Sequence, residues 1–574
     1  MDFTYKKMDN SSLYEAISSN QFLNLKSSQT YVPIYTRFFS LSDKNIDKVT
    51  LNNYYNINSI SKMHDKNSCN ANIVDPSGVL SNVDVFFKYS PLLDPMKYLI
   101  GKYDISDNSL LNLPYLGRKT CHAKCEDPNN SAYVDSFFTY LSSQLLHTHQ
   151  FPHALDFYGS FLSRKINFQC NIADDIDYLN DSSFFHDNKG RLFEIDNIHV
   201  NELFNIDTRK KKETIAIANE NDTSVILDLS DASELEHLSN VFINGPAYET
   251  TQDLNLDLNL DLNNGLVLTH DLSYNVSRKS DGNSDCSSRY SVTDDEQDGD
   301  DYNADDVHYG EDNYDENEDI IIATIKDFPV QVIAMEKCSN TLDSHIVECE
   351  KDISDTEWGS IMAQIIFILL AYKKTFEFTH NDLHTNNIMY VPTNKTYLYY
   401  RYNSKHYKVP TFGKLYKIID FGRAIYKFRG NVICSDSYHP KGDAAAQYNF
   451  EPYFNSNKPR IEPNFSFDLC RLACSIYDFI IDDVENDTDR TTTEARRMII
   501  GWCNDDKGRN VLYKQNGQER YPDFKLYKMI ARTVHAHTSD AVIGCEYFNR
   551  FIVPKKKLHK KDIVINIEQL PSYV

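Results

Sequence analysis

The feature that most constrains the fold is a polar stretch, His380–Asn387, followed further along by the tripeptide Asp-Phe-Gly at 420–422. Apolar segments flank both. A helix is expected from about Asp355 to Lys374, and the short apolar runs Ile388–Tyr390 and Leu415–Ile419 have the length of buried strands. The predicted order is helix, polar loop, strand, strand and then the Asp-Phe-Gly tripeptide, which indicates an α+β fold.

Local signals support this helix and one insertion. Ser354 and Glu357 match the capping-box pattern at the expected helix start. Apolar residues then recur at helical spacing and form one face, namely Trp358, Ile361, Met362, Ile365, Ile366 and Leu369. Between the two strands, Thr396–Tyr407 is rich in tyrosine and predicts an inserted hairpin.

The polar residues in this order are those that phosphoryl transfer from ATP requires. Asp382 stands where a carboxylate can orient an acceptor hydroxyl, and we predict that it is catalytic. Asn387 and Asp420 supply an amide and a carboxylate that can hold Mg²⁺ against phosphates. Either motif alone is weak, but the pair in this order is specific.

With these motifs the chain resembles the protein kinase superfamily, over roughly 56–162 and 320–553. The phrases HNDLHTNNIMY, VPTFGKLYKIIDFGRAIY, PLLDPMKYLIGKY and YVDSFFTYLSSQLL are more narrowly similar to serine/threonine kinases of giant DNA viruses such as mimivirus. The resemblance implies a bilobal fold, with a small antiparallel-sheet N-lobe and a mainly helical C-lobe. It also implies ATP and Mg²⁺ as cofactors and a serine or threonine acceptor on a protein.

The resemblance and the composition together divide the chain into six parts. We predict an N-terminal extension (1–50), a first N-lobe part (51–206), an acidic insertion (207–319), the last N-lobe strand and hinge (320–338), a C-lobe (339–553) and a C-terminal tail (554–574). The insertion includes Asp294–Asp319, with 14 acidic and no basic residues. Such composition buries too little apolar surface to offset its ordering entropy, so we expect disorder. The alternating repeat Asp253–Leu262 could alternatively form an edge strand.

The N-lobe should supply a lysine for the α- and β-phosphates and an acid that pairs with it. Val83–Tyr89 reads as the central strand, which makes Lys88 the candidate and Lys102 the second choice. The expected helix Ala132–Leu146 contains a single acid, Asp135, where most kinases have Glu. Asp135 either pairs with the lysine or only favours the first turn of the helix through its dipole.

A strand over Val330–Cys338 resembles the last N-lobe strand and the hinge. Met335 would then be the gatekeeper residue beside the nucleotide. The backbone from Glu336 to Cys338 would face adenine. The alternative is an ordinary buried strand that ends in a charged turn.

Several kinase features are missing or altered. No G-x-G-x-x-G lies before Lys88, so the phosphate lid is expected in another hairpin, around 62–67. Asn381 replaces the arginine that would read a phosphorylated activation loop, and no A-P-E follows the tripeptide at 420–422. His384 replaces a lysine; it is either a loop histidine that bonds a backbone carbonyl or a partial cation beside the γ-phosphate. Asp468, in a helix that begins near Phe467, is expected to accept hydrogen bonds from the catalytic-loop backbone.

Charge and composition limit partners and location. The net charge of −24 makes nonspecific nucleic-acid binding unfavourable, and the clustered acids favour a basic protein substrate. No signal peptide is evident, and the longest apolar run, Ile361–Tyr372, is too short to span a bilayer. We therefore expect no membrane partner and a cytoplasmic protein, in the host cytoplasm or the virion if the source is viral. Cys121 and Cys125 could begin a zinc site, but ordinary thiols are favoured.

Three functions remain open on the sequence. The first is an active serine/threonine protein kinase. The second is a small-molecule kinase of the aminoglycoside phosphotransferase type, which His384 and the absent A-P-E would suit. The third is a pseudokinase scaffold, which the absent glycine loop would suit. The retained set of Asp382, Asn387 and Asp420 favours an enzyme.

Overall fold

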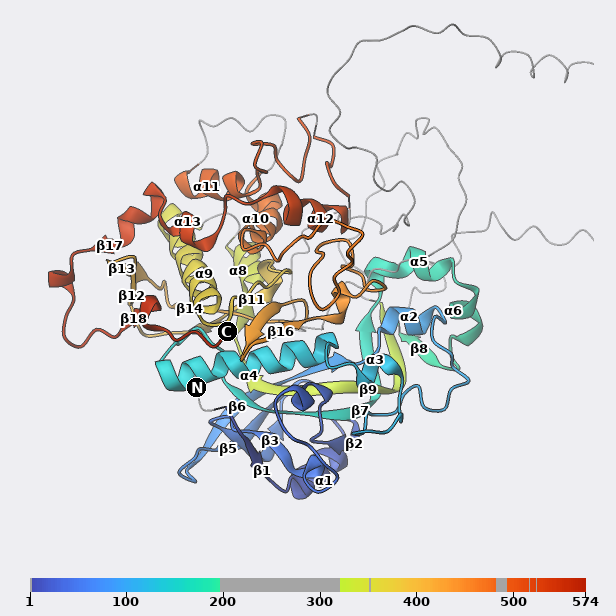
Figure 1. Cartoon of the computed structure of the whole chain (residues 1–574). Coiled ribbons are helices and arrows are strands. Elements are labelled where there is room, and N and C mark those ends of the chain that lie inside the picture. Colours follow the sequence, from blue (N-terminus) through green and yellow to red (C-terminus); the bar gives the residue numbers. More distant parts are fainter. Residues whose placement is uncertain (1–2, 197–320, 350–352, 482–492, 516, 523) are drawn as a thin grey trace, which may run out of the picture. The chain divides into compact units, whose positions relative to one another are not determined.

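The computed structural model describes residues 3–574 except 197–320, 350–352, 482–492, 516 and 523. The described residues belong to one compact unit. It is a mixed α+β structure, in which a curled antiparallel sheet of half-barrel form is followed by a group of helices and smaller sheets (Figure 1). The α+β prediction is therefore confirmed. The predicted acidic insertion, 207–319, lies outside the described residues.

The large sheet has seven strands in the order β2-β7-β9-β6-β5-β4, and β8 pairs with β9 beside them. Neighbouring strands all run antiparallel. The strands are β2 (Leu25–Gln29), β4 (Asn56–Met63), β5 (Ser68–Val74), β6 (Leu80–Pro91), β7 (Phe157–Asn171), β8 (Phe193–Asp196) and β9 (Ile322–Glu336). The expected strands Val83–Tyr89 and Val330–Cys338 are thus present as neighbours, β6 and β9.

The helices follow the apolar patterns of the sequence. They are α1 (Ser11–Ser19), α2 (Pro95–Leu99), α3 (Ala123–Glu126), α4 (Ser131–His149), α5 (Ile176–Asn180), α6 (Ser183–Asn188), α8 (Leu342–Glu348), α9 (Asp355–Phe376), α10 (Phe467–Ile480), α11 (Glu494–Trp502), α12 (Phe524–Thr533) and α13 (Ser539–Ile543). The α9 start is as predicted, because the Ser354 hydroxyl accepts a hydrogen bond from the Glu357 backbone N–H at 3.2 Å.

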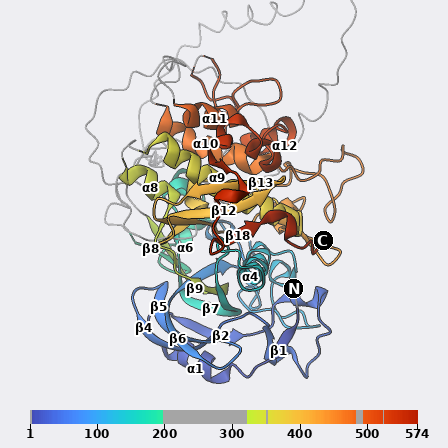
Figure 2. The same cartoon turned by 90° about the vertical axis from the view of Figure 1, so that its left-hand side faces the viewer.

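Helix α4 joins the sheet to the helices. It packs on β7 and β9, and both views show it between the large sheet and the helical part (Figures 1 and 2). On its other side Phe138 makes ring contacts with Tyr372 and Phe376 of α9. Because α4 is covered on both sides, its residues from Ala132 to Leu145 are all buried, and an acid among them must find a partner.

The smaller sheets hold the polar loop and the insertion. Their strands are β1 (Tyr5–Lys7), β3 (Val49–Leu51), β10 (Asn340–Thr341), β11 (Ile388–Pro392), β12 (Tyr397–Tyr402), β13 (Lys405–Pro410), β14 (Lys414–Ile418), β15 (Ile425–Phe428), β16 (Asn431–Cys434), β17 (Ile552–Val553) and β18 (Val564–Asn566). Strands β11 and β14 pair on either side of the hairpin β12–β13, which confirms the predicted insertion.

Both predicted terminal segments take part in the fold. In the range 1–50, β2 pairs with β7 and so extends the large sheet, and β1 pairs with β3. In the range 554–574, β18 pairs in parallel with β12. The apolar stretch Phe548–Val553 forms part of a 3-10 turn and then β17. The extended end of this stretch is stabilised by antiparallel pairing of β17 with β13.

One described helix, α9, has the length and apolar composition that a membrane span requires, so the shorter run read from the sequence underestimated it. Within the protein, however, 89% of its most apolar 18-residue window is buried. Its apolar surface is thus already covered by the helices and strands around it.

Candidate active site

A cavity of about 500 Å³ lies where β6, the start of α4, the 380–387 loop and the segment after residue 420 meet. Five predicted site residues line it, namely Lys88, Asp135, Asp382, Asn387 and Asp420. They come from four separate parts of the chain. The fold thus brings together five of the residues that the sequence assigned to one site, and we call these five side chains the central cluster.

Within the central cluster, Lys88 pairs with two carboxylates. Its Nζ lies 2.7 Å from Asp135 Oδ2 and 2.9 Å from Asp420 Oδ1. The Lys88 and Asp135 side chains are only 11% and 3% exposed. Asp135 also accepts a hydrogen bond from the Phe421 backbone N–H at 2.8 Å. The aspartate therefore binds both the lysine and the backbone next to Asp420.

The charges of this group are unbalanced, with one ammonium between two carboxylates. Burial raises the pKa of Asp135, and the nearby Asp420 raises it further against the opposing effect of Lys88. Burial also acts to raise the pKa of Asp420, but the Lys88 ammonium outweighs it and holds that pKa below its usual range. The group carries a net negative charge when all three side chains are ionised, which favours an added cation.

Backbone strain occurs in the polar loop and in the segment that follows β14. Asn381 and Asp420 both have left-handed backbones, with φ of 63° and 62°. Asn and Asp tolerate this region better than other residues with a Cβ, but it still costs free energy. Such conformations cluster at functional sites, where the surrounding structure enforces them.

Asp468 holds the backbone of the polar loop, as predicted. Its two carboxylate oxygens accept hydrogen bonds from the backbone N–H groups of His380 and Asn381, each at 2.8 Å. Asp468 lies in the first turn of α10 and is buried, and burial is the main cause that raises its pKa. The loop is therefore fixed to the core of the helical part.

Asn387 turns both of its amide hydrogens into the loop. Its Nδ2 donates to the Asp382 carbonyl at 2.9 Å and lies 3.0 Å from His384 Nε2. This leaves the Asn387 Oδ1 as the side of the amide that can bind a hard cation. His384 Nε2 contacts this amide, and both interpretations of the His384 side chain stay predictions.

The donor set fits a magnesium ion. Oxygen ligands suit Mg²⁺, and Asn387 Oδ1 and the Asp420 carboxylate both belong to residues that line the cavity. Among the residues that the structure describes, no group of three or more His, Cys, Asp and Glu could hold a metal ion. A site made of one amide, one carboxylate and a nucleotide needs no such group.

The zinc candidate at Cys121 and Cys125 lies elsewhere in the sequence. Between these two cysteines, His122 Nδ1 accepts a hydrogen bond from the Lys124 backbone N–H at 3.2 Å.

Asp382 is surrounded by groups that the sequence did not reveal. The Tyr527 hydroxyl donates to Asp382 Oδ1 at 2.7 Å and accepts a hydrogen bond from Arg471 Nε at 3.0 Å. Arg423 Nε lies 4.0 Å from Asp382 Oδ2. Burial acts to raise the pKa of Asp382, but Arg423, then His384 and Arg471, and the Tyr527 hydrogen bond outweigh it. The net effect holds that pKa well below its usual range, so Asp382 is ionised at neutral pH.

The missed residues differ in how visible they were. Arg423 directly follows the tripeptide at 420–422, and its position beside a predicted magnesium ligand was a usable signal. Tyr527 is 145 residues from Asp382 in the chain, and no local pattern around it points to the polar loop. Its ring belongs to the amphipathic helix α12, which alone indicates only packing.

The predicted hinge residues lie outside this cavity. Met335 and Glu336 end β9, where they pair with Phe86 and Val85 of β6. The Glu336 carboxylate accepts a hydrogen bond from Lys417 Nζ at 2.7 Å, and its backbone N–H donates to the Asp156 carbonyl at 2.9 Å.

Cys338, the last of these residues, is half-buried, and burial raises the pKa of its thiol to about 12. The structure thus places all three residues at the end of the strand next to Lys88, and their contact with adenine stays a prediction.

The hairpin expected near 62–67 is present. Strands β4 and β5 pair around a turn at 64–67, and this turn folds back on β6. The Phe87 backbone N–H donates to the Asn67 carbonyl at 2.7 Å, and the Tyr89 hydroxyl donates to the Lys66 carbonyl at 3.1 Å. The turn therefore lies on the strand that carries Lys88, and its role as a phosphate lid stays a prediction. Lys102, the second candidate lysine, is exposed and does not line the cavity.

Comparison with known proteins gives little further guidance. No protein-family model matches the chain. One curated protein, the uncharacterized protein ZK177.2 of Caenorhabditis elegans, is 26% identical over 106 residues, which cover 17% of this chain. The chain spans about a third of the length of that relative, 36%.

Proposed function

We propose that this chain is an ATP- and Mg²⁺-dependent serine/threonine protein kinase with a bilobal kinase-like fold. The observation that carries the proposal is the contact of Lys88 with both Asp135 and Asp420, in a cavity that Asp382 and Asn387 also line. This arrangement provides one cation for phosphate, two oxygen ligands for a metal ion and one ionised carboxylate for an acceptor. Phosphoryl transfer depends on such positioning and electrostatic stabilisation.

Each side chain has a role that follows from its surroundings. The Lys88 ammonium, fixed by two carboxylates, binds phosphate oxygens, and Asn387 and Asp420 would hold the metal ion. A bound Mg²⁺ would neutralise charge on the phosphates. Asp382, kept ionised by Arg423 and its neighbours, accepts a hydrogen bond from the acceptor hydroxyl and receives its proton.

A small-molecule acceptor is the second candidate. The cavity is also lined by Lys124 of α3 and by the segment 436–443, largely through polar side chains. An acceptor of limited size would fit such a space. The protein substrate remains our first choice, and the acidic segment Asp294–Asp319, outside the described residues, would favour a basic one. A cytoplasmic or virion location belongs to the same proposal.

Labelled ATP tests both candidates. The purified full chain with Mg²⁺ is offered γ-labelled ATP together with itself, a basic protein mixture or an aminoglycoside. We expect label on protein, and Asp382→Asn, which keeps the shape but not the charge, should lose it. Label on the aminoglycoside alone would favour the second candidate. No transfer, together with no rise in melting temperature on adding Mg-ATP, would contradict the kinase proposal and favour a scaffold.

A further inference from the structure

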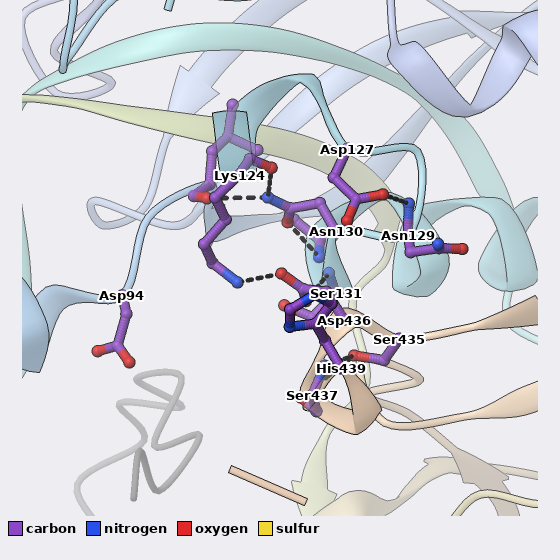
Figure 3. A network of polar contacts seen from close by, with 12 residues as sticks. Asp94, Lys124, Asp127, Asn129, Asn130, Ser131, Ser435, Asp436, Ser437 and His439 are labelled. Carbon is purple, nitrogen blue, oxygen red and sulfur yellow. Dashed lines mark hydrogen bonds and ion pairs between the residues drawn. The ribbon is translucent and has the colours of Figure 1, made fainter. Parts of the chain in front are cut away.

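The segment after Asp420 touches the start of α4 through one carboxylate. Asp436 begins a 3-10 turn, Asp436–Tyr438, that directly follows β16. Its Oδ1 accepts a hydrogen bond from the Ser131 backbone N–H at 3.1 Å, and its Oδ2 pairs with Lys124 Nζ. Its own backbone N–H donates to the Asn129 carbonyl at 2.7 Å. Figure 3 shows Lys124 and the first residues of α4 converging on this side chain.

These contacts suit a helix N-terminus electrostatically. Ser131 is the first residue of α4, and its N–H is one of the donors that a helix leaves unpaired. A carboxylate there is favoured by the helix dipole. Burial acts to lower the pKa of Lys124, but Asp436 foremost, then Asp94 and Asp443, outweigh it and raise that pKa. The pair is thus a charged contact, with side chains 28% and 10% exposed.

The anchored end of α4 is close to the central cluster. Asp135 follows Ser131 by four residues, about one helical turn and roughly 6 Å along the axis. Asp135 in turn binds Lys88 and the Phe421 backbone. A shift of the start of α4 therefore moves the carboxylate that holds the lysine.

Nearby hydroxyl groups are already engaged within the protein. Ser435 is fully buried, and its Oγ accepts a hydrogen bond from the Ser437 backbone N–H at 3.1 Å. The Tyr438 hydroxyl is buried and donates to the Arg423 carbonyl at 2.8 Å. Asn381, where an arginine would read an added phosphate, instead accepts a hydrogen bond from the Tyr448 hydroxyl at 2.8 Å. An unmodified aspartate thus makes the contact between this segment and α4.

We infer that Asp436, with Lys124, is a positioning residue that holds α4 so that Asp135 can bind Lys88, without any covalent modification of the segment. The kinetic part of this inference rests on the proposed function. The helix itself does not depend on Asp436, because the Asn130 side chain caps it independently through the Ala132 N–H at 3.1 Å. Substitution of Asp436 should therefore leave α4 folded but free to shift.

A double-mutant cycle tests the inference. Asp436→Asn is expected to weaken Mg-ATP binding and lower kcat/KM roughly tenfold, in the range of other networks that couple sites. Because it acts through Asp135, adding it to Asp135→Asn should cause no further loss. Asp436→Glu should restore most of the activity. Asp127→Asn is the matched control, because that nearby carboxylate accepts a hydrogen bond from the Asn129 N–H at 2.8 Å, within its own loop.

A second readout needs neither ATP nor activity. Modification of Lys88 by acetic anhydride, followed by mass spectrometry, reports how well the lysine is held. Asp436→Asn should speed this modification several-fold, and Ser437→Ala and Asp127→Asn should not. Equal rates in Asp436→Asn and the parent, or multiplicative effects of the 436 and 135 substitutions, would overturn the inference. Absent Mg-ATP binding with faster Lys88 modification would instead overturn only the proposed function.

Discussion

The two sides of the cavity differ in how far apart their contacting residues lie in the sequence. On the side of the expected metal site, Asn387 shares one loop with Asp382, and Asp420 follows the paired strands β11 and β14. On the acceptor side, Asp382 meets Tyr527 from α12, and Asp436 meets Lys124 from α3 across 312 residues. The residues of the metal side lie in short sequence motifs, whereas those of the acceptor side come together only through tertiary contacts. Substitutions on the two sides should therefore fail in different ways.

The largest effect is expected from Asp382→Ala. Loss of the carboxylate that receives the acceptor proton should reduce phosphoryl transfer by about a hundredfold or more while Mg-ATP binding is kept. Initial rates and ATP titration of the melting temperature measure the two properties. Lys88→Met should also lose binding, and exposed Lys102→Met is its matched control. A parent-like rate in Asp382→Ala would show that the motif side of the cavity is not the site of chemistry.

A somewhat smaller effect is expected from Asp420→Asn. A neutral amide is a poorer ligand for Mg²⁺ than a carboxylate, and the pair with Lys88 is lost as well. Mg-ATP affinity and rate should both fall, on the order of tenfold or more, and Asn387→Ala should act in the same direction but more mildly. Calorimetric titration with Mg-ATP checks this. If both variants bind as the parent does, the two oxygens are not metal ligands.

On the acceptor side, Tyr527→Phe should have a moderate effect that depends on pH. The Tyr527 hydrogen bond is one of the contacts that lower the pKa of Asp382, so its loss should raise that pKa. Activity falls as pH drops through the pKa of Asp382, and the acid limb of the rate profile should therefore move to higher pH. Near neutral pH the loss should be about tenfold, the lower end for one hydrogen bond to a charged group, which contributes roughly 1.5 kcal/mol. A uniform loss at all pH values would indicate only a packing role.

The smallest effect on activity is expected away from the cavity, at Tyr400 in β12. Its hydroxyl lies 2.6 Å from His153 Nε2, and His153 Nδ1 lies 2.7 Å from the Tyr416 carbonyl. Burial lowers the pKa of His153 to about 3, so the ring is neutral in the folded protein. Tyr400→Phe should lower the free energy of unfolding by about 1–3 kcal/mol, because a buried partner is left unsatisfied. Denaturant unfolding measures this, and activity of the folded protein should stay within about twofold.

The same contrast explains what the sequence could predict. The helices and strands next to the motifs could be predicted because their apolar periodicity and capping are local signals. The Ser354 cap of α9 and the strands β6 and β9 are examples. Asp135 was found because it is the single acid on its expected helix. Tyr527 and Asp436 were not found, since their roles depend on which helix or turn packs against the loop. Pairing with strands more than 100 residues away also turned parts of the expected terminal segments into strands, β2 and β18.

The hinge prediction shows a limit of another kind. Sequence order placed Met335 and Glu336 correctly at the end of a buried strand beside β6. It could not foresee that Lys417 Nζ would bind both the Glu336 carboxylate and the Ala154 carbonyl, the latter at 2.8 Å. Side-chain pairing of this kind depends on the approach of β14 to the end of β9.

The register of β8 with β9 offers a practical opening for protein engineering. Asp196 pairs directly with Ile322, so the chain on either side of the 197–320 segment is held on neighbouring antiparallel strands. Two residues of turn-forming sequence are enough to connect strands held in this way. The same junction could carry a fluorescent reporter or serve as new chain termini in a circular permutant, and neither change would alter a residue that lines the cavity.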